Sequence, residues 1–168
     1  TAVGYNALLS NTTGSGNIAV GSRALDACTT GATNLAIGDS ALGALTTTNN
    51  NVAIGAACLE LTTGHNNTGI GPYVLDANTT GEGNVGIGNV ALSGNTTGDH
   101  NVGIGPSSLQ AATTADYNIG IGYNSMGATT TGANNIAIGY YAMVTNTTGA
   151  GNVAVGKSAL DANTTASN

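Results

Sequence analysis

The chain has 168 residues, and only 6% of them are charged. Its 27 glycines and the absence of Phe and Trp argue against an ordinary compact core, which large aromatic side chains help to fill. The net charge is −6 with only two basic residues, Arg23 and Lys157, so we expect no binding to nucleic acid or to anionic membranes. No apolar run approaches the length of a transmembrane helix, and no membrane insertion is expected.

A unit that begins with Asn repeats along the chain. With that Asn as position 1, successive units begin at Asn17, Asn34, Asn51, Asn67, Asn84, Asn101, Asn118, Asn135 and Asn152. The numbering advances by 17 at each step, except from Asn51 to Asn67, where it advances by 16. Position 4 is Val or Ile, position 5 is Gly, position 9 is Leu or Met, and a Thr-Thr pair follows near positions 13 and 14. A fixed period of this length is typical of solenoids.

Each unit predicts one coil. Positions 2 to 4, as in residues 85–87, alternate aliphatic, tiny and aliphatic side chains, which is the pattern of a short strand. Gly at position 5 permits a bend with positive φ. Positions 7 to 10, as in residues 90–93, predict a second short extended piece with Leu inward, and Thr-Thr-Gly leads into a polar turn. Pro72 and Pro106, both at position 6, fit a corner where no ladder donor is needed.

Stacked coils would repeat about every 4.8 Å and place like residues above one another. The Asn at position 1 is then expected to form a ladder of side-chain amides. Positions 2, 4 and 9 are expected to fill the interior, which leaves the small residue of position 3 on the outside as a smooth column for a neighbouring subunit. The members of this column are Ala19, Ala36, Ala53, Gly69, Gly86, Gly103, Gly120, Ala137 and Ala154.

We therefore expect an all-β parallel β-solenoid, or β-roll, of about ten coils in a single array over residues 1–168. The segments Asn-Val-Ala-Ile-Gly at residues 51–55 and Asn-Ile-Ala-Ile-Gly at residues 135–139 resemble the head repeats of YadA-type trimeric autotransporter adhesins. Residues 1–14 resemble the Asn-Thr-Ala-Val-Gly-Tyr-x-Ala-Leu arrays of phage tail fibres and bacterial surface proteins. The resemblance implies a left-handed, trimeric roll with an adhesive or fibre role and no catalytic residue.

Few residues are candidates for catalysis, metal binding or disulfide formation. His65 and His100 lie in polar turns of different coils without a Ser or Cys partner, so no enzyme activity and no cofactor are expected. Asp26, Glu60, Asp76 and Asp161 recur at position 10 and are interpreted as a solvated acidic column, not a metal site. Cys28 and Cys58 lie two coils apart, roughly 10 Å along the axis, which is too far for a disulfide.

Three features of the turns and corners are candidate contact sites. Asn-x-Thr sequons occur at Asn11, Asn66, Asn78, Asn95, Asn146 and Asn163. Neighbouring coils are too close for two glycans, so a turn-forming Asn ladder is the favoured interpretation. The Thr columns could bind ice, but in an extended segment at most one of two adjacent columns would face outward. Corner tyrosines could contact a partner or glycan, or pack between subunits: Tyr5, Tyr73, Tyr123, Tyr140 and Tyr141.

The sequence predicts a structural or adhesive segment of an extracellular fibre, in a phage tail or on a bacterial surface. Neither end carries an atypical polar cap, which predicts a slice of a longer fibre or a subunit that stacks end to end into a filament. A solenoid face that binds a glycan or ice is the third alternative. The expected partners are other copies of the chain, as a homotrimer or filament, and a cell-surface glycan or matrix.

Overall fold

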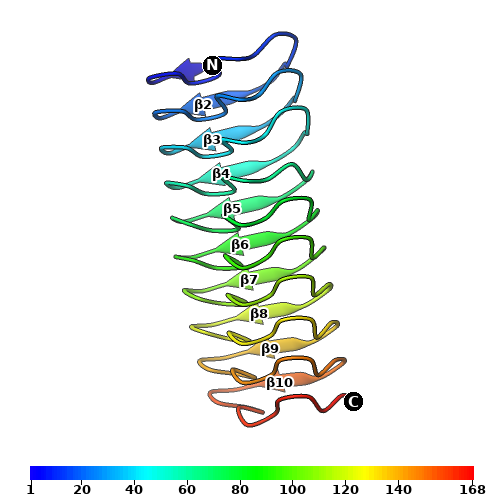
Figure 1. Ribbon diagram of the computed structural model, residues 1–168. Helices are drawn as coiled ribbons and strands as arrows, with labels where there is room; N and C mark the ends of the chain where they lie inside the picture. Colours follow the sequence, from blue (N-terminus) through cyan, green and yellow to red (C-terminus); the bar gives the residue numbers. More distant parts are fainter.

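The computed structural model describes all residues, 1–168. Ten short strands lie side by side in one sheet in chain order, every neighbouring pair is parallel, and there is no helix (Figure 1). The strands are β1 (Ala2–Val3), β2 (Ile18–Val20), β3 (Leu35–Ile37), β4 (Val52–Ile54), β5 (Thr68–Ile70), β6 (Val85–Ile87), β7 (Val102–Ile104), β8 (Ile119–Ile121), β9 (Ile136–Ile138) and β10 (Val153–Val155). The predicted parallel β-solenoid is confirmed.

Like residues stack on like residues along the sheet. In the pair β6 and β7, Gly86 lies opposite Gly103 and Ile87 opposite Ile104. The shorter step between β4 and β5 does not shift this register, because Ala53 still lies opposite Gly69. The missing residue is therefore absorbed in a turn between the two strands.

The strands face the opposite way from the prediction. Position 3 points into the coil: Ala19, Ala36 and Ala137 are 0% exposed, whereas Ile18 and Val153 are 43% and 61% exposed. The expectation that positions 2 and 4 fill the interior was wrong. The interior is too narrow for two branched columns, since it is already occupied by the position 9 side chains from Leu25 to Met143 and by the side chains of positions 8 and 12.

In the interior, a larger side chain at position 8 of one coil is accommodated by glycine at position 3 of the next. Position 8 is a small Ala or Ser in most coils, but it is Cys58 and Val74 in two of them. Each of these larger side chains faces a glycine of the next strand. A Cβ on Gly69 would lie 2.5 Å from Cys58 Sγ, and a Cβ on Gly86 would lie 2.5 Å from Val74 Cγ1. Ala fits at position 3 only where position 8 of the preceding coil is small.

The segment after each strand is a series of tight turns and not the extended piece that the sequence predicted. Val90 and Leu92 have φ of 51° and 54°, in the left-handed region, and the same two positions are left-handed in every coil. Their N–H groups thereby point along the rod: Val90 donates to Pro72 O of the preceding coil, and Leu92 donates to Ser108 O of the next. Side chains at position 9 still face inward, so that part of the prediction was right.

The first of these turns explains the corner residues. Ala91 N–H donates to Gly88 O at 3.3 Å, and the third residue of the turn, Val90, has positive φ. This is the arrangement of a type II turn, whose second position favours proline. Pro72 and Pro106 occupy that position in their coils. Gly88 itself has φ of 122°, and a Cβ there would meet the backbone of Gly105, so only glycine fits.

Candidate interaction surfaces

The position 1 asparagines form a buried ladder through the whole rod. In one rung, Asn118 N–H donates to Asn101 Oδ1 at 3.0 Å, while Asn118 Nδ2 donates to Gly132 O at 2.9 Å. Asn118 Oδ1 accepts the N–H of Asn135 in the next coil. The same contacts join Asn17, Asn34, Asn51, Asn67, Asn84, Asn101, Asn118, Asn135 and Asn152. These amides hold coils together and offer nothing to an external ligand.

Asparagine also occupies position 12 in five coils, and these five residues begin five of the six sequons. Asn78, Asn95 and Asn146 are 0% exposed, and Asn95 Nδ2 donates to Asn78 Oδ1 at 2.9 Å. A glycan cannot be attached to these side chains in the folded chain. Asn11 and Asn66 are exposed, and Asn163 is half-buried.

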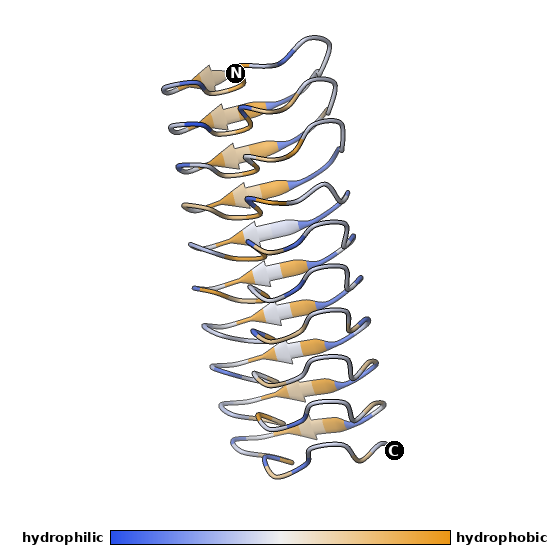
Figure 2. Cartoon of the chain, viewed as in Figure 1, coloured by the Kyte–Doolittle hydropathy of each residue, from blue (hydrophilic) through white to orange (hydrophobic).

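The outer face of the sheet is aliphatic from end to end. Positions 2 and 4 carry Val, Ile or Leu in every coil except for Thr1 and Thr68. In Figure 2 the apolar residues of the strands appear as orange segments along the rod. Val3, Ile18, Ile37, Ile70, Ile138, Val153 and Val155 are each at least 38% exposed. Ten strands, nine of them three residues long, cover roughly 48 Å by 10 Å. An apolar patch of roughly 500 Å² is at the upper end for a monomer and is often functional.

This face replaces the surface column that was predicted at position 3. The structure places Ala19, Ala36, Ala53, Gly69, Gly86, Gly103, Gly120, Ala137 and Ala154 inside their own coils, where all are buried. A second chain cannot contact them there. We therefore correct the predicted interface: any apolar contact along the sheet must involve positions 2 and 4.

Tyrosines gather at the corner beyond β8 and β9. The rings of Tyr123 and Tyr140 stack with centroids 5.4 Å apart, and Tyr141 packs edge-on against both. Lys157 Nζ lies 5.8 Å from the centroid of Tyr140. The ring faces of Tyr123 and Tyr140 are thus partly covered by one another, although both residues are nearly half exposed.

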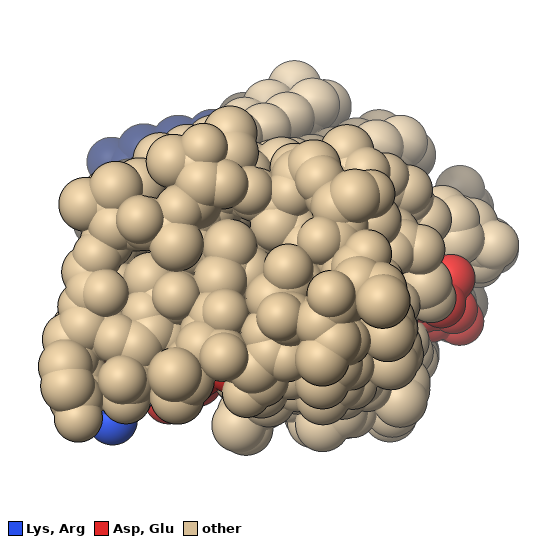
Figure 3. Space-filling view, turned by 90° about the horizontal axis from the view of Figure 1, so that it is seen from above, with Lys and Arg blue, Asp and Glu red and all other residues tan.

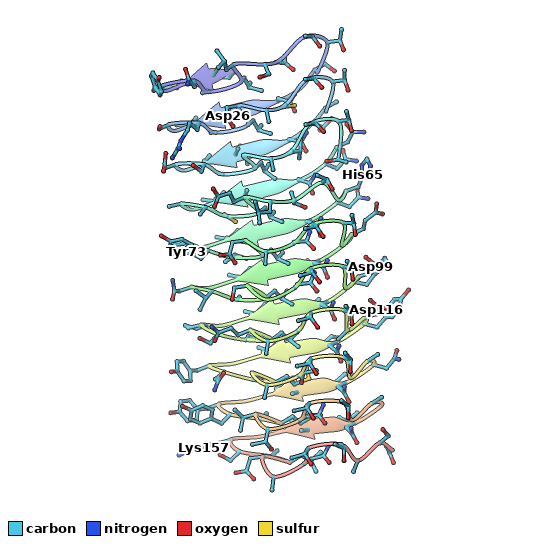
Figure 4. The ribbon with its side chains drawn as sticks, viewed as in Figure 1. Asp26, His65, Tyr73, Asp99, Asp116 and Lys157 are labelled. Carbon is cyan, nitrogen blue, oxygen red and sulfur yellow. The ribbon has the colours of Figure 1, made fainter.

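The other predicted tyrosines do not join this cluster. Tyr5 and Tyr73 are 74% and 51% exposed and form no aromatic pair. The prediction missed Tyr117, which is 57% exposed and stacks on His100 at 5.1 Å. These two rings occupy position 17 of successive coils, so the repeat itself contained the signal. Figure 4 shows Tyr73 and Lys157 at one edge of the rod and His65, Asp99 and Asp116 at the opposite edge.

Both Thr columns reach the surface. Position 14 is exposed in all nine coils that have it, from Thr13 to Thr165, and the position 13 threonines are exposed or half-buried. The expectation of a single outward column was wrong because this segment is a turn and not a strand. The two columns differ, since at eight junctions the position 13 hydroxyl donates to a carbonyl of the next coil, as Thr96 Oγ1 does to Thr113 O at 2.9 Å.

Charged groups are sparse and weakly paired. Looking down the rod, Figure 3 shows a largely uncharged surface with charges at a few points of the rim. Arg23 and Asp39 form one ion pair at 3.4 Å between half-exposed side chains, a kind that contributes about 0–1 kcal/mol. Gly43 leaves an open hollow of about 260 Å³ between Asp26 and Glu60. Within the chain, no three His, Cys, Asp or Glu side chains are placed to hold a metal ion.

The remaining candidate groups take part in packing. Cys28 and Cys58 are buried free thiols at different interior positions, and burial raises the pKa of Cys58 to about 12. His65 Nδ1 accepts the N–H of Asn49 at 3.2 Å, and His100 stacks on Tyr117. Asp99 and Asp116 each accept a backbone N–H of the preceding coil at 2.8 Å.

The carboxyl group of Asp76 is expected to make the free energy of unfolding depend on pH. Burial raises the pKa of this carboxyl above its ordinary value, and the nearby Glu60 carboxylate adds to the rise. Since the folded pKa exceeds the unfolded one, the group favours folding below its unfolded pKa, and this contribution is lost as pH rises through the folded pKa. We expect Asp76→Asn to raise the free energy of unfolding at pH 7, with no difference below about pH 3.

Urea denaturation at several pH values measures this difference. Asp161→Asn, at the same position of an exposed coil, is the matched control. An equal change for both variants across pH would contradict the assignment to Asp76.

Comparison with protein-family models, with curated proteins and with solved structures found no match. The resemblance to adhesin and tail-fibre repeats therefore rests on the repeat motif. The structure supports a parallel β-solenoid in which each coil is one repeat of the sequence. No helix long and apolar enough to cross a bilayer is present.

Proposed function

We propose that the chain is a rigid segment of an extracellular fibre, such as a phage tail fibre or a bacterial surface adhesin, and that it associates with copies of itself. The observation that carries the proposal is the aliphatic outer face of the sheet. Val and Ile side chains are usually buried in folded proteins, yet here they cover one whole side of the rod. The face has no charged residue along its length.

The free energy gained by covering this face is comparable to the cost of association. Covering roughly 500 Å² of apolar surface at about 25 cal/mol per Å² is worth roughly 12 kcal/mol for each chain. Association costs about 4–15 kcal/mol in lost freedom of motion, so the gain and the cost are of the same order. Three parallel rods around a common axis would bring like side chains to the same height and close the assembly. The left-handed and trimeric form implied by the resemblance is part of this proposal.

Light scattering across a dilution series tests the proposal. We expect the mass of a trimer at micromolar concentration. Ile87→Lys with Ile104→Lys is expected to weaken the complex at least 100-fold, because two charges would be buried without partners. Thr97→Lys with Thr114→Lys adds the same charge to the same coils on another face, and we expect no change.

The other outcomes distinguish the alternatives. A mass that grows without limit with concentration would favour a filament stacked end to end. A wild-type chain that stays monomeric at all concentrations would overturn self-association through this face, and equal weakening by both Lys pairs would show that the face is not specific.

A second candidate function is the binding of ice by the Thr face. The observation that favours it is the exposure of both Thr columns over most coils. The coil that begins at Asn51 is one residue short and lacks position 14, so the outer column is interrupted there. Inhibition of ice recrystallisation by the wild type, lost on Thr97→Lys with Thr114→Lys and retained by the Ile pair, would support this function.

A further inference from the structure

The turn at positions 13 to 15 makes the same contact at almost every junction between coils. At the first junction, the N–H groups of Thr12, Thr13 and Gly14 and the hydroxyl of Thr12 all donate to one oxygen, Thr29 O, at 3.0–3.3 Å. Three successive N–H groups around one negative oxygen form a concave donor nest. At eight junctions both the N–H and the Oγ1 of the position 13 Thr donate to the carbonyl at position 13 of the next coil.

The junction between the coils beginning at Asn34 and Asn51 lacks this contact. The N–H groups of Thr46, Thr47 and Thr48 donate to no protein acceptor, and neither does Thr46 Oγ1. The Thr48 side chain is 7% exposed, and its Oγ1 has no hydrogen-bond partner. A buried hydroxyl left without a partner is destabilising, so this group favours a bound species that can accept a hydrogen bond.

Two departures from the repeat meet at this point. The next coil is one residue short: Thr62 occupies the interior position 12, Thr63 occupies position 13, and Gly64 follows at once without a residue at position 14. The carbonyl of Thr63 consequently accepts none of the donors above it. Thr48 stands where most coils have Gly, and it adds a second hydroxyl to the same turn.

The segments that form the junction carry no carboxylate of their own, and Glu60 directly precedes one of them. Residues 44–50 and 61–66, which form the two sides of the junction, contain no Asp or Glu. Thr46 and Thr47 are exposed, so a solute can reach them. We propose that this junction binds a small monovalent anion of the size of chloride, which takes the place that the carbonyl oxygen of the next coil occupies at the other junctions. The site lies in the turn and does not depend on the fibre role.

Amide NMR spectra of the full chain test the site. Chloride is titrated at constant ionic strength against gluconate, an anion too bulky for the nest. We expect saturable shifts of the amides of Thr46, Thr47 and Thr48, and none at the matched turn of Thr29, Thr30 and Gly31. Inserting one threonine between Thr63 and Gly64 restores the full length of the coil, and it is expected to weaken the chloride affinity at least fivefold.

A second variant tests the contribution of the Thr48 hydroxyl separately from that of the backbone N–H groups. Thr48→Gly removes the buried hydroxyl and keeps the short coil, so we expect it to reduce the affinity while the Thr46 and Thr47 amides still respond. The proposal is overturned if chloride produces no saturable shift in the wild type, or if the matched turn or the insertion variant responds with the same affinity.

Discussion

Replacing Asn118 by alanine is expected to lower the free energy of unfolding by about 3–5 kcal/mol, because the substitution leaves two buried backbone groups without partners. It removes the bonds from Nδ2 to Gly132 O and from Asn135 N–H to Oδ1. Both Gly132 and Asn135 are buried, so the two backbone groups have no access to water. Each orphaned group costs about 1–3 kcal/mol. Urea denaturation followed by circular dichroism measures the change.

Asn89→Ala is the control for this prediction. Asn89 is exposed, makes no side-chain hydrogen bond and has no left-handed φ. We expect a change within about 0.5 kcal/mol, as for most surface substitutions. If Asn89→Ala and Asn118→Ala destabilise the chain equally, the ladder contributes nothing beyond an ordinary asparagine.

The second large effect is expected at Gly86, in the interior of the coil. A Cβ at this position would lie 2.5 Å from Val74 Cγ1, so Gly86→Ala forces the two coils apart. Overpacking of this kind costs about 1–3 kcal/mol, and we expect the upper end of the range because the interior is narrow.

Combining this change with Val74→Ala is expected to restore most of the lost stability. The double variant reproduces a combination found elsewhere in the rod, where position 8 is Ala41 and position 3 of the next coil is Ala53. Val74→Ala alone leaves a cavity and is expected to destabilise by about 1–3 kcal/mol, so the coupling energy of the double-mutant cycle is expected to be at least about 1 kcal/mol. Additive effects would show that position 3 does not face position 8 of the preceding coil. The conservative change Val85→Thr in the same strand points outward and is the control.

The difference between the two faces of the strand matters for the proposed assembly. A column of Ala and Gly on the outside would favour close backbone contact between chains. With Val and Ile outside, the contact is made by interdigitating side chains over a broader area. The Lys substitutions at Ile87 and Ile104 are therefore placed on the face that the structure exposes.

The sequence by itself determined the period, the parallel stacking and the positions of the ladders. Identical residues one period apart can lie above one another only if the coils are stacked in register, and an interior Asn is satisfied by its equivalent one coil away. The inward direction of Leu92 and the corner at Pro72 also followed from the repeat.

Only the tertiary structure decided which face of the strand is inside. The alternation of side chains shows that Val85 and Ile87 share a face of the strand, but it does not show whether that face lies inside or outside the coil. Which face is inside depends on the interior volume that Leu75 and Val74 leave free. The turn around Val90 and Leu92 could likewise not be predicted from the sequence pattern. Left-handed backbone at such residues is strained by itself, and here it is stabilised by N–H bonds to the neighbouring coils, which exist only in the folded rod. The donor nest at Thr46 arises from a residue missing one coil away, and such an effect exists only once the coils are stacked.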